Sequence, residues 1–438
     1  MTTFHKIFSL SVAVFLGALP VHGQDFHERL KADYNIAAGI YHPYHHGDLT
    51  DTKAPAGYKP FYISHFGRHG SRYHASMDYF ATGTNGLIAA KEAGILTETG
   101  LELYDGFMRV VEEHKGMEGE LAPLGALEHK EIAARMYRRF PSVFNSRSRN
   151  EVECVASTIT RCIMSMANFS ESLDDMNPDL DFTFLTGEKY FSYIMKPSVD
   201  KTISRKVRVR EDSVRKADCG YDKLFDKLFT DKQKAKELIK KRQDFVNSVY
   251  MVGSICLDLD YLNLDILKYI DIEELTPQVY VRSDRLYGEC CNSAEYGDVS
   301  NCSADDLLAD FLSKADAALE DGSRRAADLR FGHDTGLMPL MGLMGVKELA
   351  VQYNMVGAHE HWFTYDVVPM GSNFQMIFYR NKKGNVLVKM LYNEQETCIP
   401  ALAPAEGPYY SWPELREYLN SKEEAARAFN TGFKAGKN

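Results

Sequence analysis

Short stretches in which apolar and polar residues alternate recur along the chain, and each predicts a β-strand. The clearest covers 59–67 (KPFYISHFG), is rich in aromatic and β-branched residues and ends at a glycine. Further strands are predicted at 150–158, 362–369, 373–381 and 385–395, the last two joined by a short KKGN turn that predicts a hairpin. Strand-forming segments therefore lie toward the two ends of the chain.

Segments with the 3.6-residue spacing of amphipathic helices separate these strands. The segment 121–144 carries leucine, isoleucine, alanine and methionine at helical positions, and Pro141 marks its end. The segments 159–173 and 303–322 follow the same pattern. Because strands alternate with helices at both ends of the chain, the sequence predicts an α/β fold with a central, mostly parallel sheet flanked by helices.

The middle of the chain differs in character. Residues 196–242 contain 16 Lys/Arg against 8 Asp/Glu, although the whole chain has a net charge of −10. This region lacks long apolar strands and predicts an inserted, mainly helical cap over 186–285, which divides the α/β core into 24–185 and 286–438. A solvated face of amphipathic helices explains the basic charge, and that face would attract polyanions if it lies over the site.

The first residues have the features of an export signal. Lys6 precedes the apolar run 7–19 (IFSLSVAVFLGAL), and small residues follow before a cleavage position after Gly23. The run is shorter than the ~20 residues that span a bilayer, and no other stretch approaches that length. We therefore expect residues 1–23 to be a signal peptide and the mature protein to be periplasmic or secreted, without a membrane anchor.

Composition narrows the classes of ligand. The chain is 45% hydrophobic and 26% charged, which is typical of a soluble globular protein. Its net charge of −10 argues against general nucleic-acid binding, because nucleic-acid-binding domains are basic. Any anionic ligand must therefore be held by a local cluster of positive charge.

The cysteines leave several interpretations open. An exported protein can oxidise its eight cysteines, and the segment 290–302 (CCNSAEYGDVSNC) can close a short loop. The spacing does not fix which cysteines pair. The chain has no CxxC pair, so the sequence does not predict a structural zinc site.

The turn after the first strand, GRHGSRY (67–73), concentrates charged and polar residues. Gly67 and Gly70 let the backbone bend and leave room for a ligand at the end of a strand, where ligands of α/β sheets bind. Arg68 and Arg72 can each direct paired N–H groups at a phosphate dianion. His69 between them can act as a nucleophile when neutral, and the two arginines lower its pKa.

Two further segments repeat this arrangement. Arg161 follows a predicted strand and opens a predicted helix, a position that suits an anion. His333 and Asp334 follow Gly332 at a strand-to-helix turn. A protonated Asp334 can act as a general acid and His333 can donate to a phosphoryl oxygen, while the alternative role for Asp334 is a helix cap.

These motifs resemble those of a known family. RHGSRY (68–73) followed far downstream by GHDT (332–335) is similar to the histidine phosphatase superfamily, in its acid phosphatase and phytase branch. VASTITR (155–161) looks like that branch's second arginine segment, and the resemblance extends from about residue 60 to 400. It implies an α/β core with a helical cap and catalysis through a covalent phosphohistidine.

The resemblance also implies a role for each residue. His69 would attack phosphorus and Asp334 would protonate the leaving alkoxide, then activate the water that hydrolyses the phosphohistidine. The phosphoryl oxygens would be held by Arg68, Arg72, Arg161 and His333. No metal and no cofactor is implied, because the arginines neutralise the charge of the transition state.

Two departures leave the substrate open. His74 stands where the family usually has a proline. The segment 331–345 (FGHDTGLMPLMGLMG) resembles the multiple inositol-polyphosphate phosphatases, which typically carry His-Ala-Glu with the acid one residue later; here Asp334 precedes Thr335. The sequence thus favours an exported, phytase-like phosphomonoesterase acting on phosphorylated small molecules. The alternatives are a broad-specificity acid phosphatase and an inactive phosphate-binding protein on the same fold.

The segment AHEHW (358–362) raises a different hypothesis. On a strand, His359 and His361 would share one face and could chelate a metal, as in a metal-dependent hydrolase. The HExH spacing is not the HExxH of zinc enzymes, so a polar rim of the pocket is the preferred interpretation. A mutase-like transferase fits less well, because that branch lacks the His-Asp acid.

Overall fold

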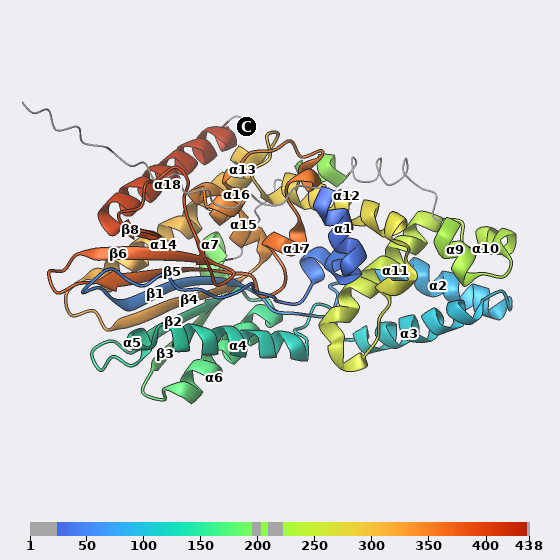
Figure 1. Ribbon diagram of the computed structural model, residues 1–438, viewed down its shortest axis with the longest axis horizontal. Helices are drawn as coiled ribbons and strands as arrows, with labels where there is room; N and C mark the ends of the chain where they lie inside the picture. The colour runs from blue at the N-terminus through green and yellow to red at the C-terminus, as the bar shows by residue number, and fades with distance from the viewer. Residues whose placement is uncertain (1–23, 195–202, 209–221, 436–438) are drawn as a thin grey trace, which may run out of the picture.

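The computed structural model describes residues 24–194, 203–208 and 222–435. The predicted signal peptide at 1–23 lies outside the described residues, and so does much of the basic segment 196–242. Figure 1 shows a sheet covered by helices on the left and a cluster of helices on the right.

Eight strands form one mixed sheet in the order β3-β2-β4-β1-β5-β6-β7, with β8 pairing to β6. The pairs among β1 to β4 are parallel, and all pairs involving β5 to β8 are antiparallel. The strands are β1 (Lys59–Arg68), β2 (Glu151–Ala156), β3 (Asp181–Thr186), β4 (Arg325–Gly332), β5 (Asn373–Arg380), β6 (Val386–Tyr392), β7 (Gln395–Thr397) and β8 (Tyr409–Ser411). The predicted α/β class and the β5–β6 hairpin are confirmed. The sheet is mixed rather than mostly parallel, with three parallel and four antiparallel pairings among the described strands, because short connections join β5 to β6 and β6 to β7.

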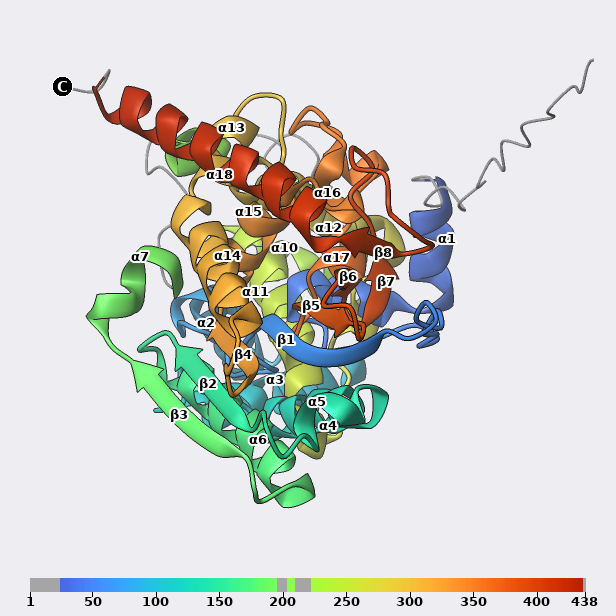
Figure 2. The ribbon, with the colours of Figure 1, turned by 90° about the vertical axis from the view of Figure 1, so that its left-hand side faces the viewer.

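Helices cover both faces of the sheet (Figure 2). One face packs against α4 (Pro123–Arg139), α5 (Pro141–Phe144) and α6 (Thr160–Met176), and the other against α14 (Asp305–Leu319), α15 (Asp334–Met344) and α18 (Trp412–Ala435). The alternation of β1 explains this arrangement: Ile63 faces the first group, whereas Tyr62 and Phe66 face the second.

A second hydrophobic core lies in the helical cluster. Its helices are α1 (Gln24–Ala32), α2 (Asp78–Glu92), α3 (Glu98–His114), α9 (Asp222–Leu228), α10 (Lys232–Leu238), α11 (Arg242–Cys256) and α12 (Ile272–Cys290). The segment 186–285 supplies α9 to α11 and most of α12. The other helices come from outside it, and α2 and α3 belong to the connection between β1 and β2.

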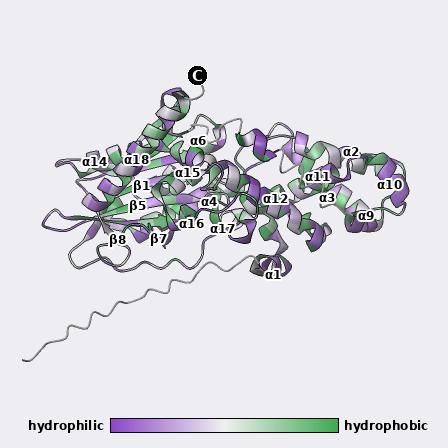
Figure 3. Ribbon diagram, turned by 90° about the horizontal axis from the view of Figure 1, so that it is seen from above, coloured by the Kyte–Doolittle hydropathy of each residue, from purple (hydrophilic) through white to green (hydrophobic). Residues whose placement is uncertain are grey.

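The remaining elements are short. They are η1 (Tyr34–Tyr41), η2 (Glu188–Tyr190), α7 (Phe191–Ile194), η3 (Leu257–Leu262), η4 (Leu267–Tyr269), α13 (Gly297–Cys302), α16 (Lys347–Ala350), η5 (Ala358–Glu360) and α17 (Thr364–Val367). The strand predicted at 362–369 is wrong, because this segment contains α17. Polar and apolar residues are interleaved along the helices (Figure 3), and within the described ranges no helix has an apolar stretch that could cross a membrane.

Candidate functional site

The loop that follows β1 passes very close to the first turn of α4. A Cβ atom at Gly70 would lie 2.5 Å from the carbonyl oxygen of Gly125, and a Cβ atom at Gly125 would lie 2.1 Å from that of Ser71. No side chain fits between two backbones at that separation, so both positions require glycine. The loop is therefore held against α4 where His69 leaves the strand.

Backbone hydrogen bonds fix the start of this loop in the sheet. The N–H of Arg68 donates to the Ser372 carbonyl over 2.8 Å, and the N–H of His69 donates to the Gly332 carbonyl over 3.0 Å. The His69 carbonyl in turn accepts the N–H of Gly371 over 3.0 Å. His69 consequently lies at the carboxyl ends of the parallel strands, between the end of β4 and the start of β5.

His69 is buried and its imidazole has a defined tautomer. Its Nδ1 lies 2.9 Å from the Gly70 carbonyl oxygen, which can only accept, so Nδ1 carries the proton and Nε2 carries the lone pair. Burial holds the pKa of His69 well below its usual value, and Arg161, Arg68, Arg72 and His333 lower it further. The imidazole is therefore neutral and nucleophilic in mildly acidic solution.

Arg68 is almost fully buried and is anchored by backbone carbonyls. Its Nη1 donates to the carbonyl of Ile40 over 2.8 Å and to that of Val368 over 2.7 Å. These bonds orient the guanidinium so that Nη2 lies 3.5 Å from Oδ2 of Asp334. Burial lowers the pKa of Arg68, and Asp334 opposes that effect.

Arg72 and Arg161 are anchored in the same way. The Nη1 of Arg72 donates to the Tyr73 carbonyl over 2.8 Å and its guanidinium lies 5.5 Å from the centre of the Tyr41 ring; the Nη1 of Arg161 donates to the Gly119 carbonyl over 3.2 Å. Over the part of the chain that is described, neither arginine forms an ion pair with a carboxylate. Burial and then Arg72 lower the pKa of Arg161, as expected for two cations that lie close together with no anion bound between them.

His333 caps the start of α15, directly after β4 ends. Its Nε2 lies 3.2 Å from the Ser157 hydroxyl, and its ring centre lies 5.6 Å from that of His69 at a nearly perpendicular angle of 72°. Burial lowers the pKa of His333 to about 4, helped by Arg161. A neutral His333 next to His69 has one N–H group with which to hold a phosphoryl oxygen.

Asp334 is the first residue of α15. Its Oδ1 accepts the N–H of Thr335 over 2.9 Å, so it makes a helix-end hydrogen bond as well as the contact with Arg68. Burial raises the pKa of Asp334, but Arg68, His333, the Thr335 N–H and Arg72 together outweigh burial and hold the pKa below its usual value. The carboxyl is therefore ionised when no anion is bound.

The six residues predicted from the sequence converge at one place. They come from three strand ends: the ends of β1, β2 and β4. The group consists of Arg68, His69, Arg72, Arg161, His333 and Asp334. A nucleophile, a carboxyl group and several N–H donors in one buried site can bind and cleave a phosphate ester.

Some residues at the site were missed by sequence reasoning. Glu128 accepts the backbone N–H of Ser71, the Ser71 hydroxyl and the backbone N–H of Tyr44, each over 2.7 Å. Asp258 accepts the backbone N–H of Arg72 over 3.1 Å. Glu128 follows Gly125 by three residues, a spacing that places it one helical turn from the glycine that contacts the loop; no local pattern singles out Asp258.

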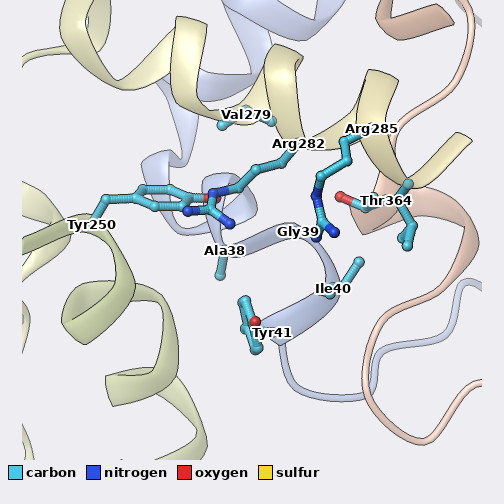
Figure 4. Close-up of a pocket in the computed structure, with 10 residues that line it drawn as sticks. Ala38, Gly39, Ile40, Tyr41, Tyr250, Val279, Arg282, Arg285 and Thr364 are labelled. Atoms are coloured by element: carbon cyan, nitrogen blue, oxygen red, sulfur yellow. The ribbon is translucent and has the colours of Figure 1, made fainter. Parts of the chain in front are cut away.

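A small cavity of about 10 Å³, with room for about one water molecule, adjoins the arginines of the site (Figure 4). Arg282 and Arg285 extend into it from α12 toward the backbone of η1. Arg282 lies over the Tyr250 ring, 4.9 Å from its centre, and its Nη2 donates to Asn247 over 2.5 Å. The cavity is lined by Ala38, Gly39, Ile40, Tyr41, Tyr250, Val279, Arg282, Arg285, Leu286 and Thr364. Ile40 and Tyr41 contact the arginines of the site, so the two share a wall.

The histidines proposed as an alternative metal site have other contacts. His359 lies in η5, with Nδ1 2.9 Å from Oδ1 of Asp284 and its ring stacked on Tyr280 at 4.2 Å. The ring of His361 stacks on Tyr353 at 4.7 Å. In residues 24–194, 203–208 and 222–435, no three histidine, cysteine, aspartate or glutamate side chains are grouped to hold a metal ion.

Two of the cysteines that the sequence allowed to close a short loop, Cys291 and Cys302, are thiols in the described part of the chain. Cys162 lies at the site itself, where its Sγ is 3.3 Å from the Gly332 carbonyl oxygen. Burial raises the pKa of Cys162 to about 11, so this thiol is neutral and packs against the base of the site.

Comparison with known proteins gives a consistent picture. No family model matches the chain. Human multiple inositol polyphosphate phosphatase 1 is 23% identical over 312 residues, which are 64% of this chain and 62% of the human protein. The chain thus spans less than two thirds of the length of that relative.

Solved structures share the fold. The multiple inositol polyphosphate phosphatase of Bifidobacterium longum, in complex with inositol hexasulfate, superposes with a TM-score of 0.74 at 19% identity and covers 87% of this chain and 97% of its own. The phytase from D. castellii has a TM-score of 0.67 at 14% identity, with 89% and 85% covered. The Hafnia alvei phytase with myo-inositol hexakis sulphate has a TM-score of 0.53 at 11% identity, with 85% and 99% covered.

Proposed function

We propose that this chain belongs to the acid phosphatase and phytase branch of the histidine phosphatase superfamily and hydrolyses inositol polyphosphates through a phosphohistidine on His69. The observation that carries the proposal is the state of His69. Its Nδ1 is bonded to the Gly70 carbonyl, its Nε2 has a lone pair, and three arginines surround it. A neutral histidine held among cations is suited to attack a phosphate dianion.

In the first step, Nε2 of His69 attacks phosphorus while the bond to the ester oxygen breaks. The N–H···O bond from Nδ1 to Gly70 stabilises the positive charge that develops on the ring. The leaving oxygen takes the electron pair of the broken bond and a proton from Asp334. This transfer avoids expulsion of a free alkoxide, which is the costly part of cleaving an alkyl ester.

The arginines and His333 stabilise the charge on the transferred group. Each arginine is anchored through Nη1, so its remaining N–H groups are available to the three equatorial oxygens. Donors that are fixed before the reaction need no reorganisation in the transition state. This is the main requirement of phosphoryl transfer, in which protein groups position and neutralise rather than react.

In the second step, water attacks the phosphohistidine. Asp334, now ionised, accepts a proton from the water, and Nε2 of His69 leaves as the P–N bond breaks. Inorganic phosphate is released and Asp334 is protonated again. The same carboxyl therefore acts as acid and then as base, and its protonation state limits the pH range of the enzyme.

Two features favour polyphosphorylated inositols over simple monoesters. Arg282 lies behind the wall formed by Ile40 and Tyr41, so it adds to the positive charge near the site that attracts a substrate with several phosphate groups. The similar proteins from human, Bifidobacterium longum and D. castellii are named as inositol polyphosphate phosphatases or phytases. We also propose that the protein is exported to the periplasm or secreted, on the basis of residues 1–23.

Phosphate release by the purified full chain tests the proposed function. We expect kcat/KM for inositol hexakisphosphate to exceed that for p-nitrophenyl phosphate and for sugar phosphates at pH 5. Equal values across the panel would indicate a broad-specificity acid phosphatase. Phosphate binding without release from any ester would indicate an inactive binding protein. Amino-terminal sequencing of the protein from its native host tests export, and an intact residue 1 would contradict it.

A further inference from the structure

Two buried carboxyl groups lie against the loop that carries His69. Glu128 belongs to α4 of the core and accepts the N–H and the hydroxyl of Ser71. Asp258 belongs to η3, which follows α11 in the helical cluster, and accepts the N–H of the next residue, Arg72. Asp258 is 0% exposed and Glu128 is 5% exposed. Two carboxyls from different parts of the molecule thus hold consecutive residues of one loop.

The two carboxyl groups also act on one another. Each is desolvated, and a negative charge on Glu128 disfavours a negative charge on Asp258. Glu128 accepts the Ser71 hydroxyl over 2.7 Å and Asp258 accepts the N–H of Arg72 over 3.1 Å, so the two carboxyls hold neighbouring residues of the loop. Among the residues that the structure describes, Oδ1 of Asp258 has no hydrogen-bond partner, which is costly for a buried carboxylate oxygen and acceptable for a protonated carboxyl. The burial of both groups and this unpartnered oxygen fit one proton and one negative charge on the two carboxyls.

The surrounding charges decide which group holds that proton. Arg68 and the hydrogen bonds from Ser71 and Tyr44 favour the ionised form of Glu128, although burial leaves its pKa raised. Burial and then Glu128 raise the pKa of Asp258 far more, in spite of Arg72. Arg68 also acts on Asp258, Asp260 of the same turn faces solvent, and Arg109 of α3 donates to the Leu262 carbonyl at the end of η3. Burial raises the pKa of the neighbouring Cys256 thiol to about 12, so that thiol is neutral.

We propose that Asp258 is a positioning residue that works in its protonated form, fixing the backbone of Arg72 while Glu128 alone carries a negative charge beneath the phosphate site. A neutral Asp258 leaves the charge of Arg72 available to the ligand. Loss of the proton places a second negative charge next to Arg72 and weakens its attraction for phosphate. Phosphate affinity then falls at alkaline pH, and for an active enzyme KM rises while kcat changes less.

The test compares Asp258→Asn, which imitates the protonated carboxyl and keeps the acceptor for the Arg72 N–H, with Asp258→Ala, which removes it. Glu274→Gln is the matched control, because Glu274 is another buried carboxyl with a raised pKa that accepts two backbone N–H groups, those of Lys223 and Leu224. The Kd of inorganic phosphate is measured by calorimetry from pH 4.5 to 9 for each protein. The Kd of each variant is divided by that of the wild type at the same pH, so that the ionisation of phosphate itself, which is common to both, cancels.

We expect Asp258→Asn to bind phosphate within about threefold of wild type at pH 5 and about tenfold more tightly than wild type at pH 9. Asp258→Ala should bind about tenfold more weakly than wild type at pH 5, and Glu274→Gln should follow wild type throughout. A ratio for Asp258→Asn that does not change with pH overturns the proposal, as does a loss at pH 5 equal to that of Asp258→Ala.

The effect on KM rests on the proposed phosphatase function, whereas the effect on phosphate affinity does not. If the wild-type protein releases no phosphate from any ester, the proposed function fails and the binding ratios still decide the role of Asp258. Thermal denaturation of each variant shows whether it is folded. If Asp258→Ala is unfolded, the pH dependence of the Asp258→Asn ratio decides alone.

Discussion

The Nη2 atom of Arg68 lies 3.5 Å from the Oδ2 atom of Asp334 in the ligand-free site. The residue that would bind the phosphoryl group therefore pairs with the residue that would donate the proton. Arg68 is the largest of the charges that hold the pKa of Asp334 below its usual value. A dianion bound at Arg68 offsets that charge, so binding of the substrate itself would convert Asp334 toward its acid form.

This coupling predicts proton uptake when a dianion binds. Inositol hexasulfate is a suitable ligand, because sulfate groups do not titrate near pH 5. We expect calorimetry in buffers of different ionisation enthalpy to show uptake of up to one proton at pH 5. Asp334→Asn should bind the ligand with no such uptake. Uptake that persists in Asp334→Asn would assign the proton to another group.

The role of Asp334 as an acid predicts a dependence on the leaving group. Asp334→Asn should lower kcat on inositol hexakisphosphate by about 10²–10⁴, the usual contribution of a general acid. The loss on p-nitrophenyl phosphate should be much smaller, because p-nitrophenolate leaves without a proton. His69→Ala serves as the control, since it should abolish turnover of both esters. Equal losses for both esters in Asp334→Asn would remove its role as the acid.

Removal of a nearby arginine should raise the pKa of His69 and of His333. Arg161 is the charge that most lowers the pKa of both His69 and His333, after burial. Arg161→Ala should therefore raise the pKa of His333 above its value of about 4. As the pH is lowered, His69 and His333 should then become protonated, and the enzyme inactive, at a higher pH than in the wild type. Imidazole NMR signals followed from pH 3 to 7 measure this shift. Arg109→Ala, which leaves the site unchanged, should not produce it.

Because the loop after β1 lies so close to α4, adding a single methyl group at Gly125 should lower the stability of the protein. Gly125→Ala places a Cβ atom 2.1 Å from the Ser71 carbonyl oxygen, so the loop must move away from α4. We expect the free energy of unfolding to fall by about 1–3 kcal/mol and kcat/KM to fall with it. Gly432→Ala is the control, because it lies in α18 with open space around it and should stabilise the helix by about 0.5–1 kcal/mol. Denaturant unfolding of both variants separates the two effects.

The site was more predictable from the sequence than the fold around it. The motif residues such as His69 and Asp334 each follow an apolar strand and a glycine, and strand ends converge in an α/β sheet, so their meeting could be expected. Asp258 has no such local signal, because only the packing of η3 against the loop brings it there. Its role depends on a contact between segments 186 positions apart.

The errors in the fold have a similar physical cause. Residues 362–369 show alternation, but Trp362 packs in the core of the sheet while Phe363 packs in the core of the helical cluster. A segment that passes between two cores alternates for that reason, without pairing in a sheet. The sequence predicts that α2 and α3 belong to the first part of the α/β core, 24–185; in the structure, α2 packs against α11 and α3 against α9.

The cavity beside the site predicts how substrate preference would change. Arg282→Ala removes a positive charge near the site, and that charge attracts a multiply phosphorylated substrate more strongly than a simple monoester. We expect KM for inositol hexakisphosphate to rise about fivefold to tenfold, as for the loss of one charged contact, with KM for p-nitrophenyl phosphate unchanged. Arg282→Lys keeps the charge and should keep most of the affinity, which separates charge from packing on Tyr250. An equal rise in KM for both esters would indicate that Arg282 supports the shape of the site rather than the recognition of further phosphates.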